Sequence, residues 1–273
     1  MVRLLEIEWL KVRHHRPFWI LIGLYALCVT VICSGGKIFL QYIESRGANF
    51  NGIGPSILPI YDYPDVWQNI TFVAAIFKIF LGFIMVISIA NESNYRTLRQ
   101  NIIDGLSKRE FFLGKILVCC VLAGASTLLL LIIGVVVASV YSSVQGVEYM
   151  FDSMSFLLAH FLAVFSFLVF SLFLVLLIPK PGLLIVGLFM YTLIFEPMVS
   201  AIITYAPHGK EWLRPVAQYL PITSMNNLNH IPFPRYVMQE IQDYILLKEV
   251  IIASVWVLVN AALGYYVLRR KDW

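Results

Sequence analysis

Six long apolar segments, separated by shorter polar ones, dominate the pattern of hydrophobic and polar positions along the chain. About 20 helical residues cross a bilayer core that is about 30 Å thick, and each segment reaches that length. The pattern therefore predicts an all-α, polytopic membrane protein with a single transmembrane domain over residues 1–273. Its six predicted spans are Phe18–Phe39, Ile70–Ala90, Phe111–Tyr141, Met154–Ile178, Gly182–Tyr205 and Ile245–Leu268.

The composition agrees with this pattern and removes several other classes of protein. Hydrophobic residues make up 60% of the chain and charged residues only 13%, whereas soluble domains carry about 25% charged residues. The mean hydropathy is +0.81. A soluble enzyme, a disordered chain, a coiled coil and a disulfide-rich secreted scaffold are all excluded.

The basic residues are distributed unequally between the two sides that the six spans define. Of the 20 Lys and Arg residues, 13 fall on the side of the termini and six on the opposite side. Positively charged loops stay in the cytoplasm, so we expect both termini to be cytoplasmic in a bacterial inner or plasma membrane. Topology thus accounts for the net charge of +4, and we expect no nucleic-acid partner.

The first 16 residues form a segment of their own. Val2, Leu5, Trp9 and Val12 fall on one helical face, and the charged residues Arg3, Glu6, Lys11 and Arg13 lie elsewhere on the helix. Such a pattern predicts a helix that lies in the inner membrane interface. The alternative is a positively charged anchor with no further role.

The stretch between spans two and three, residues 91–110, predicts a short transverse helix. Tyr95, Leu98 and Ile102 recur at helical spacing, and Arg96 and Arg99 lie on another face. A helix with an apolar face and a basic face can dock into a groove of a soluble partner. The alternative is a basic loop whose periodicity is incidental.

The end of this short helix and the start of the third span carry the expected signals. Gly105 suits a helix C-cap, and Ser107 with Glu110 forms an S-x-x-E capping box directly before Phe111. The third span is therefore expected to begin in water, before it enters the hydrocarbon.

These residues resemble the coupling segment in the permeases of type-2 ABC transporters. The resemblance rests on Glu92, Thr97, Leu98, Arg99, Gly105, Ser107, Arg109 and Lys115. The ending Tyr265–Trp273 is also similar to the family's aromatic-rich turn followed by R-x-D. The chain departs from the family pattern at Arg96, where the family often has glycine.

The resemblance implies a coupling helix that contacts a separate ATP-binding subunit through Tyr95, Arg96, Leu98, Arg99 and Ile102. It further implies two copies of that ATPase, a second permease copy in a homodimer, and an outer-face or periplasmic partner. ATP and magnesium would then bind the ATPase, because no G-x-x-x-x-G-K-[ST] motif occurs in this sequence. We expect no catalytic residue, metal or cofactor in this chain.

Two charged residues lie within predicted spans: Lys78 in span two and Glu196, followed by Pro197, in span five. A charge in hydrocarbon is costly unless it is paired or faces a cavity. The matching depths predict a pair or a shared transport pathway. In the alternative, both side chains snorkel to the outer interface.

The long outer loop over residues 206–244 is rich in proline and asparagine. In the resembling family this segment forms short helices that close the exit on the outer face. We expect the same of Lys210–Gln218 and Arg235–Tyr244.

The leading interpretation is the transmembrane subunit of an ABC transporter, which exports a substrate or transmits ATP-driven motion across the membrane. One alternative is an ion-coupled secondary transporter that uses Lys78 and Glu196. Another is an intramembrane hydrolase built from His160, Glu196 and serines such as Ser126, which lie on three different spans without motif spacing. A copurifying ATPase would separate the first interpretation from the other two.

Overall fold

The computed structural model describes residues 2–48, 54–95, 97, 100, 105–144, 146–205, 211–232 and 244–271. Over these ranges the chain is helical and contains no strand, and six helical segments are long and apolar enough to cross a membrane. The all-α class and the six spans are therefore confirmed. The segments are α2 (Arg16–Ser45), α3 (Val66–Asn94), α5 (Lys108–Tyr141), α7 (Ser155–Leu177), α8 with α9 (Pro181–Thr204), and α13 (Leu247–Arg270).

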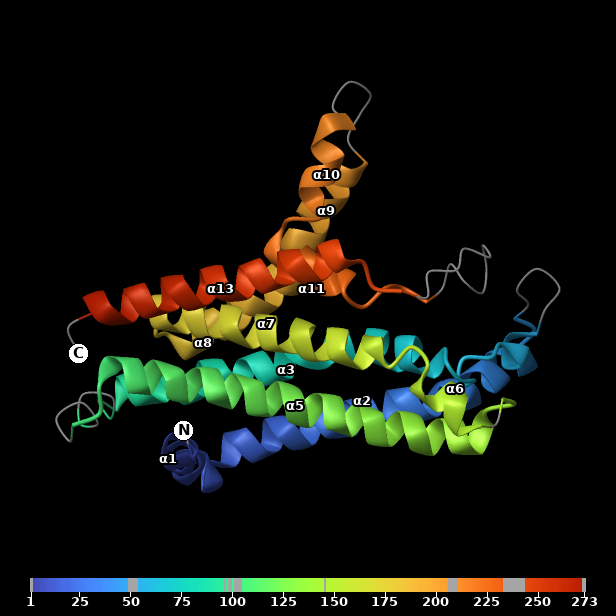
Figure 1. Cartoon of the computed structure of the whole chain (residues 1–273), viewed down its shortest axis with the longest axis horizontal. Coiled ribbons are helices and arrows are strands. Elements are labelled where there is room, and N and C mark those ends of the chain that lie inside the picture. Colours follow the sequence, from blue (N-terminus) through green and yellow to red (C-terminus); the bar gives the residue numbers. More distant parts are fainter. Residues whose placement is uncertain are drawn as a thin grey trace.

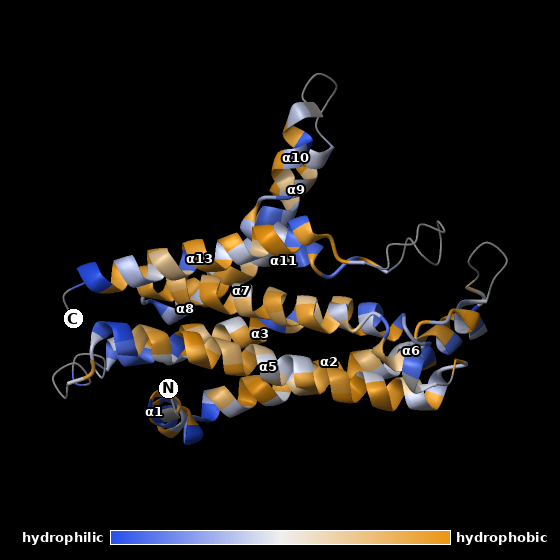
Figure 2. Cartoon of the chain, in the orientation of Figure 1, coloured by the Kyte–Doolittle hydropathy of each residue, from blue (hydrophilic) through white to orange (hydrophobic). Residues whose placement is uncertain are grey.

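The long helices lie side by side along the longest axis of the molecule (Figure 1). At one end lie α1 (Val2–Arg13), the end of α3, the start of α5, the α7–α8 turn and the end of α13, and we call this the basic end. The opposite end holds η1 (Pro55–Ile57) and α6 (Val147–Phe151). Apolar residues predominate along the bundle and hydrophilic ones gather toward its ends (Figure 2), as expected of a bundle that crosses a bilayer.

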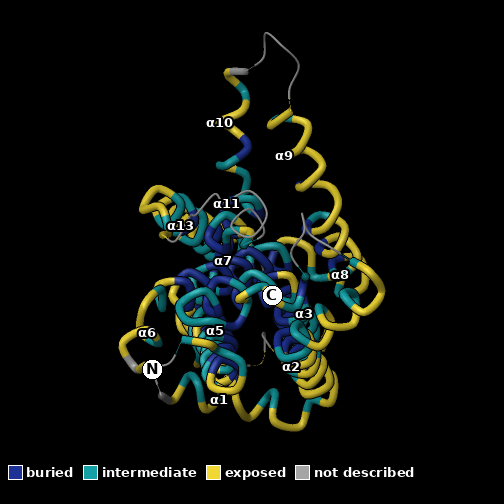
Figure 3. Tube along the Cα trace, turned by 90° about the vertical axis from the view of Figure 1, so that its right-hand side faces the viewer, coloured by how far each residue is buried: buried dark blue, intermediate teal, exposed yellow. Residues whose placement is uncertain are grey.

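The core is centred on α3 and α7, which are the most buried of the six segments (Figure 3). A glycine permits their close approach. A Cβ atom added to Gly82 of α3 would lie 2.6 Å from Phe167 Cε1 and 3.0 Å from Ser171 Oγ, both on α7. Small residues let membrane helices pack closely in this way.

The fifth span is interrupted rather than straight. The helix α8 (Pro181–Met190) passes through a π-helical turn, η2 (Tyr191–Phe195), into α9 (Glu196–Thr204). Pro197 lacks a backbone donor, which disturbs the helical ladder at this level. Beyond the π turn, α9 runs away from the bundle beside α10 (Arg214–Ala217) (Figures 1 and 3).

The helix ends differ from the predicted spans, because hydropathy marks only the part of a helix that lies in hydrocarbon. The helix α2 continues past Phe39 to Ser45, and α3 continues past Ala90 to Asn94. Polar residues extend both helices without breaking them.

The described part of the outer loop contains short helices. A 3-10 turn, η3 (Glu211–Leu213), and α10 fall within the predicted Lys210–Gln218 helix, whereas residues 235–243 lie outside the described part. A further helix, α11 (Pro221–Asn227), was not predicted. Its Pro- and Asn-rich sequence is typical of a loop, but Pro221 stands at a first-turn position, where its missing N–H costs nothing.

Candidate coupling site and buried charges

The predicted coupling segment begins where α3 ends. Tyr95 is the C-cap of α3 and its side chain is 76% exposed. Thr97 and Gln100 are helical, and the Thr97 hydroxyl donates to the Glu92 carbonyl at 3.2 Å. The predicted contact residues Arg96, Leu98, Arg99 and Ile102 lie outside the described residues.

The far end of the segment has the capping predicted from the sequence. Gly105 has φ +99°, a left-handed conformation that suits glycine. The backbone N–H of Glu110 donates to Ser107 Oγ at 3.1 Å, and the Ser107 N–H donates to Glu110 Oε2 at 2.9 Å. This reciprocal capping box fixes the start of α5.

Four charged side chains from α1, α3 and α5 meet at the basic end. Lys115 of α5 is 1% exposed and forms ion pairs with both Glu8 of α1 and Glu92 of α3. Lys11 of α1 binds the same two carboxylates, at 2.8 Å to Glu8 Oε1 and 3.1 Å to Glu92 Oε2. We call this set the basic-end network. Its two positive and two negative charges balance, so that no member is left uncompensated in a buried place.

The electrostatics of Glu8 show that the network favours the charged state of its carboxyl. Burial acts to raise the pKa of the Glu8 carboxyl, but the ammonium groups of Lys115 and Lys11 outweigh burial and lower it below the ordinary value. The Glu8 carboxylate is thus held ionised by its partners.

Glu8 was missed in the sequence, and the reason lies in the orientation of α1. The face predicted to be apolar includes Trp9, which is half-exposed and stacks edge-on against Trp19, while Glu8 is buried against α5. One signal in the sequence could have indicated Glu8. Glu8 and Lys11 are three residues apart on a helix that also carries Leu4 and Leu5, and this spacing places a charged pair beside apolar neighbours.

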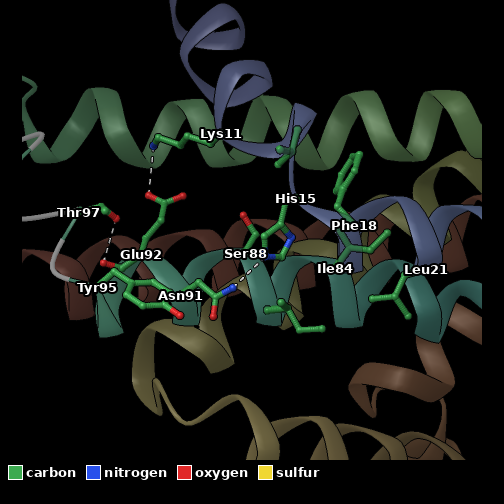
Figure 4. Close-up of a pocket in the computed structure, with 12 residues that line it drawn as sticks. Lys11, His15, Phe18, Leu21, Ile84, Ser88, Asn91, Glu92, Tyr95 and Thr97 are labelled. Carbon is green, nitrogen blue, oxygen red and sulfur yellow. Dashed lines mark hydrogen bonds and ion pairs between the residues drawn. The ribbon is translucent and has the colours of Figure 1, made fainter.

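A cavity of about 470 Å³ adjoins the basic-end network. Figure 4 shows that it is bounded by side chains from α1, α2 and α3. Lys11, Asn91 and Glu92 lie on its polar side, and Asn91 Nδ2 and His15 Nε2 are hydrogen-bonded at 3.1 Å. Phe18 is on its apolar side. No sequence motif had indicated this cavity.

The two charges predicted within the spans are both enclosed by protein. Lys78 is 2% exposed and Glu196 is 3% exposed, so neither side chain snorkels to an interface. They form no ion pair within 4.0 Å.

Both charges instead bind α11. The Lys78 ammonium donates to Asn226 Oδ1 at 2.7 Å and lies 5.6 Å from the centroid of the Phe167 ring. The Thr223 N–H donates to Glu196 Oε1 at 2.6 Å. Neither Asn226 nor Thr223 was singled out in the sequence, because no local pattern indicated that this segment folds back against α3 and α9.

Two groups considered for an intramembrane hydrolase do meet in the core. Ser126 Oγ and His160 Nε2 are hydrogen-bonded at 2.9 Å, and Ser126 Oγ also bonds the Tyr25 hydroxyl at 2.5 Å. His160 Nδ1 has no hydrogen-bond partner among the described residues, so no carboxylate orients this imidazole. The set therefore lacks the third group that prepares a serine for attack, and it links α2, α5 and α7 instead.

One known protein family matches nearly the whole chain. The family model described as "ABC-2 family transporter protein" matches residues 20–268, which include the coupling segment and nearly all of the six spans. Among curated proteins, none matches this sequence. The family match agrees with the resemblance seen in the coupling segment, and the chain belongs to the ABC-2 family of transporter proteins.

Proposed function

We propose that this chain is the membrane-spanning subunit of an ABC transporter that works as a homodimer with two separate ATPase subunits. It exports a substrate or passes ATP-driven motion to an outer-face partner. Family membership supports the role as a multi-pass transport subunit that is not itself catalytic. In this proposal both termini and the basic end face the cytoplasm, where the positively charged loops belong.

The observation that carries the coupling role is the connection across the base of the segment. Glu92 lies at the start of the segment and Lys115 lies shortly after its end, and the two are joined by a buried ion pair. Glu8 and Lys11 tie α1 to the same pair. A push on the segment by an ATPase would therefore move α1, α3 and α5 together rather than bend one loop.

Lys78 and Glu196 are proposed to act at the transport pathway. Both bind α11, which packs against α7, α9 and α13. A movement of α11 away from α3 would leave the two charges facing the vacated space. Charges that are costly in hydrocarbon are tolerated where they face a hydrated path.

Copurification tests the proposal. Tagged wild-type chain, extracted from its native membrane with mild detergent, should retain an ATP-hydrolysing subunit. Tyr95→Asp and Leu98→Asp should lower the retained ATPase at least about tenfold, because each places a carboxylate on the apolar docking face. Tyr95 is exposed in the single chain, so its replacement should leave the fold intact.

The matched control is Lys180→Asp, which adds the same side chain in the exposed α7–α8 turn at the same end of the bundle. It should retain the ATPase. Normal ATPase retention by both the Tyr95 and Leu98 variants would refute the coupling assignment, and the absence of any ATPase from wild-type preparations would favour a secondary transporter.

A further inference from the structure

The cavity beside the basic-end network has a volume of about 470 Å³, within the range of pockets that hold small organic ligands. Its wall is built by α1, the first turns of α2 and the last turns of α3 (Figure 4). These are the elements that surround the start of the coupling segment, and Tyr95 and Thr97 also line the cavity.

The polarity of the wall changes with depth in the membrane. The helix α2 leaves the basic end and α3 approaches it, so that Leu21 and Ile84 lie deeper than His15 and Asn91. The deep wall is apolar and the shallow wall carries charges, amides and hydroxyls. An occupant that matches this gradient has an apolar part in the hydrocarbon and a polar part at the interface.

The shallow wall offers charges of both signs. Lys11 Nζ lies 3.1 Å from Glu92 Oε2. The ammonium has three N–H donors, two of which reach Glu8 and Glu92. Asn91 and His15 stand beside them. A phosphate could accept from Lys11, but a headgroup with only negative charge would also meet the Glu92 carboxylate. A headgroup that carries both a phosphate and an ammonium complements both charges.

We propose that this cavity binds a phospholipid with an ammonium-bearing headgroup, of the phosphatidylethanolamine type, from the leaflet at the basic end. Its phosphate lies near Lys11 and Asn91, its ammonium near Glu92, and the upper part of its acyl chains against Phe18, Leu21 and Ile84. Lipid binding does not depend on the proposed ATPase partner. Only the naming of the leaflet as the inner one rests on the proposed topology.

Photolabelling of the full chain tests this site. The probe is a phosphatidylethanolamine with a diazirine near the glycerol end of one acyl chain, present in trace amounts in phosphatidylcholine vesicles that carry the protein. Labelled peptides should contain Phe18, Leu21 or Ile84. Excess unlabelled phosphatidylethanolamine should reduce this labelling at least fivefold, and the same amount of phosphatidylglycerol should reduce it less than twofold.

Two substitutions on α3 test whether the labelled lipid occupies this cavity. Ser88→Trp fills the cavity, since Ser88 lines it, and should reduce the labelling at least fivefold. Asn91→Leu keeps similar bulk but removes a polar contact, and should weaken the competition by phosphatidylethanolamine. Ile76→Trp is the control, because Ile76 is exposed on the same helix and lies outside the cavity wall.

Three results would overturn the proposal. They are wild-type labelling that excess phosphatidylethanolamine does not reduce, labelling of a folded Ser88→Trp variant at the wild-type level, and equal competition by phosphatidylglycerol. Gel filtration of each variant establishes whether it is folded, and Asn91→Leu provides the test if Ser88→Trp is not. None of these readouts requires ATPase activity, so a failure here is distinct from a failure of the proposed function.

Discussion

Two clusters of buried charge in this molecule are stabilised in different ways. In the basic-end network every charge has an opposite partner, and Lys115 and Lys11 each bind both Glu8 and Glu92. Within the bundle, Lys78 and Glu196 have no direct ion pair, and each is bonded to a neutral group of α11 instead.

The difference indicates what each cluster can do. Breaking a fully compensated network costs free energy, because it leaves unpaired charges buried. Such a network therefore suits helices that move together as one rigid body. Charges that are hydrogen-bonded to neutral groups of a short helix lose less stabilisation when that helix moves. The first cluster is therefore expected to be rigid, and the second able to exchange partners during a transport cycle.

The largest effect should come from the centre of the rigid cluster. Among the described residues, Lys115→Met leaves the Glu8 and Glu92 carboxylates with Lys11 as their one cationic partner, and we expect a loss of about 3–5 kcal/mol of stability. The measurement is thermal unfolding in detergent, followed by tryptophan fluorescence. A second change, Glu8→Gln in the Lys115→Met background, should recover part of the loss, because it removes one stranded charge.

Lys180→Met is the matched control for this prediction. Lys180 is exposed in the α7–α8 turn at the same end, and exposed charges contribute little to stability. Its unfolding should match that of the wild type. If Lys115→Met unfolded no earlier than Lys180→Met, the network would not be a rigid joint.

Double-mutant cycles measure the coupling free energy within each cluster. The cycle of Lys115→Met with Glu8→Gln should give a coupling free energy of about 2 kcal/mol or more, because the two groups are in direct contact. The cycle of Lys78→Met with Glu196→Gln should give only about 0.5 kcal/mol, because their attraction acts without contact. Equal couplings in the two cycles would show that the two clusters do not differ in this respect.

The sequence predicted those features that depend on local pattern. Six spans, the Ser107–Glu110 capping box and the presence of two intramembrane charges all follow from hydropathy and short-range spacing. The family resemblance came from one such local segment as well. These predictions succeed because a bilayer requires long apolar helices, and a helix start requires its own N–H groups to be satisfied.

What could not be predicted depends on contacts between distant segments. Glu8 and Lys115 are separated by 107 residues, and Lys78 and Asn226 by 148. No local signal aligns α1 with α5 or folds α11 against α3. The pairing of Lys78 with Glu196, within one chain or across a dimer, was predicted from matching depth alone, and within this chain each charge is hydrogen-bonded to α11.

The smallest expected effect is the pH dependence of the rigid cluster. Burial opposes the charge on Glu8, but Lys115 and Lys11 lower the pKa of its carboxyl below the ordinary value of 4.5. A group whose pKa is lowered by folding contributes stability above its unfolded pKa and loses that contribution as the pH falls. The stability difference between the wild type and Glu8→Gln should therefore be constant from pH 7 to about pH 5 and should shrink below about 4.5. Chemical unfolding in detergent at each pH measures this difference, and Glu6→Gln, on the exposed side of the same helix, controls for the change in charge of α1. A difference that stayed constant down to pH 3, or grew, would show that the Glu8 carboxylate is not held by these lysines in the folded chain, and the contrast with the Lys78 and Glu196 cluster would then rest on geometry alone.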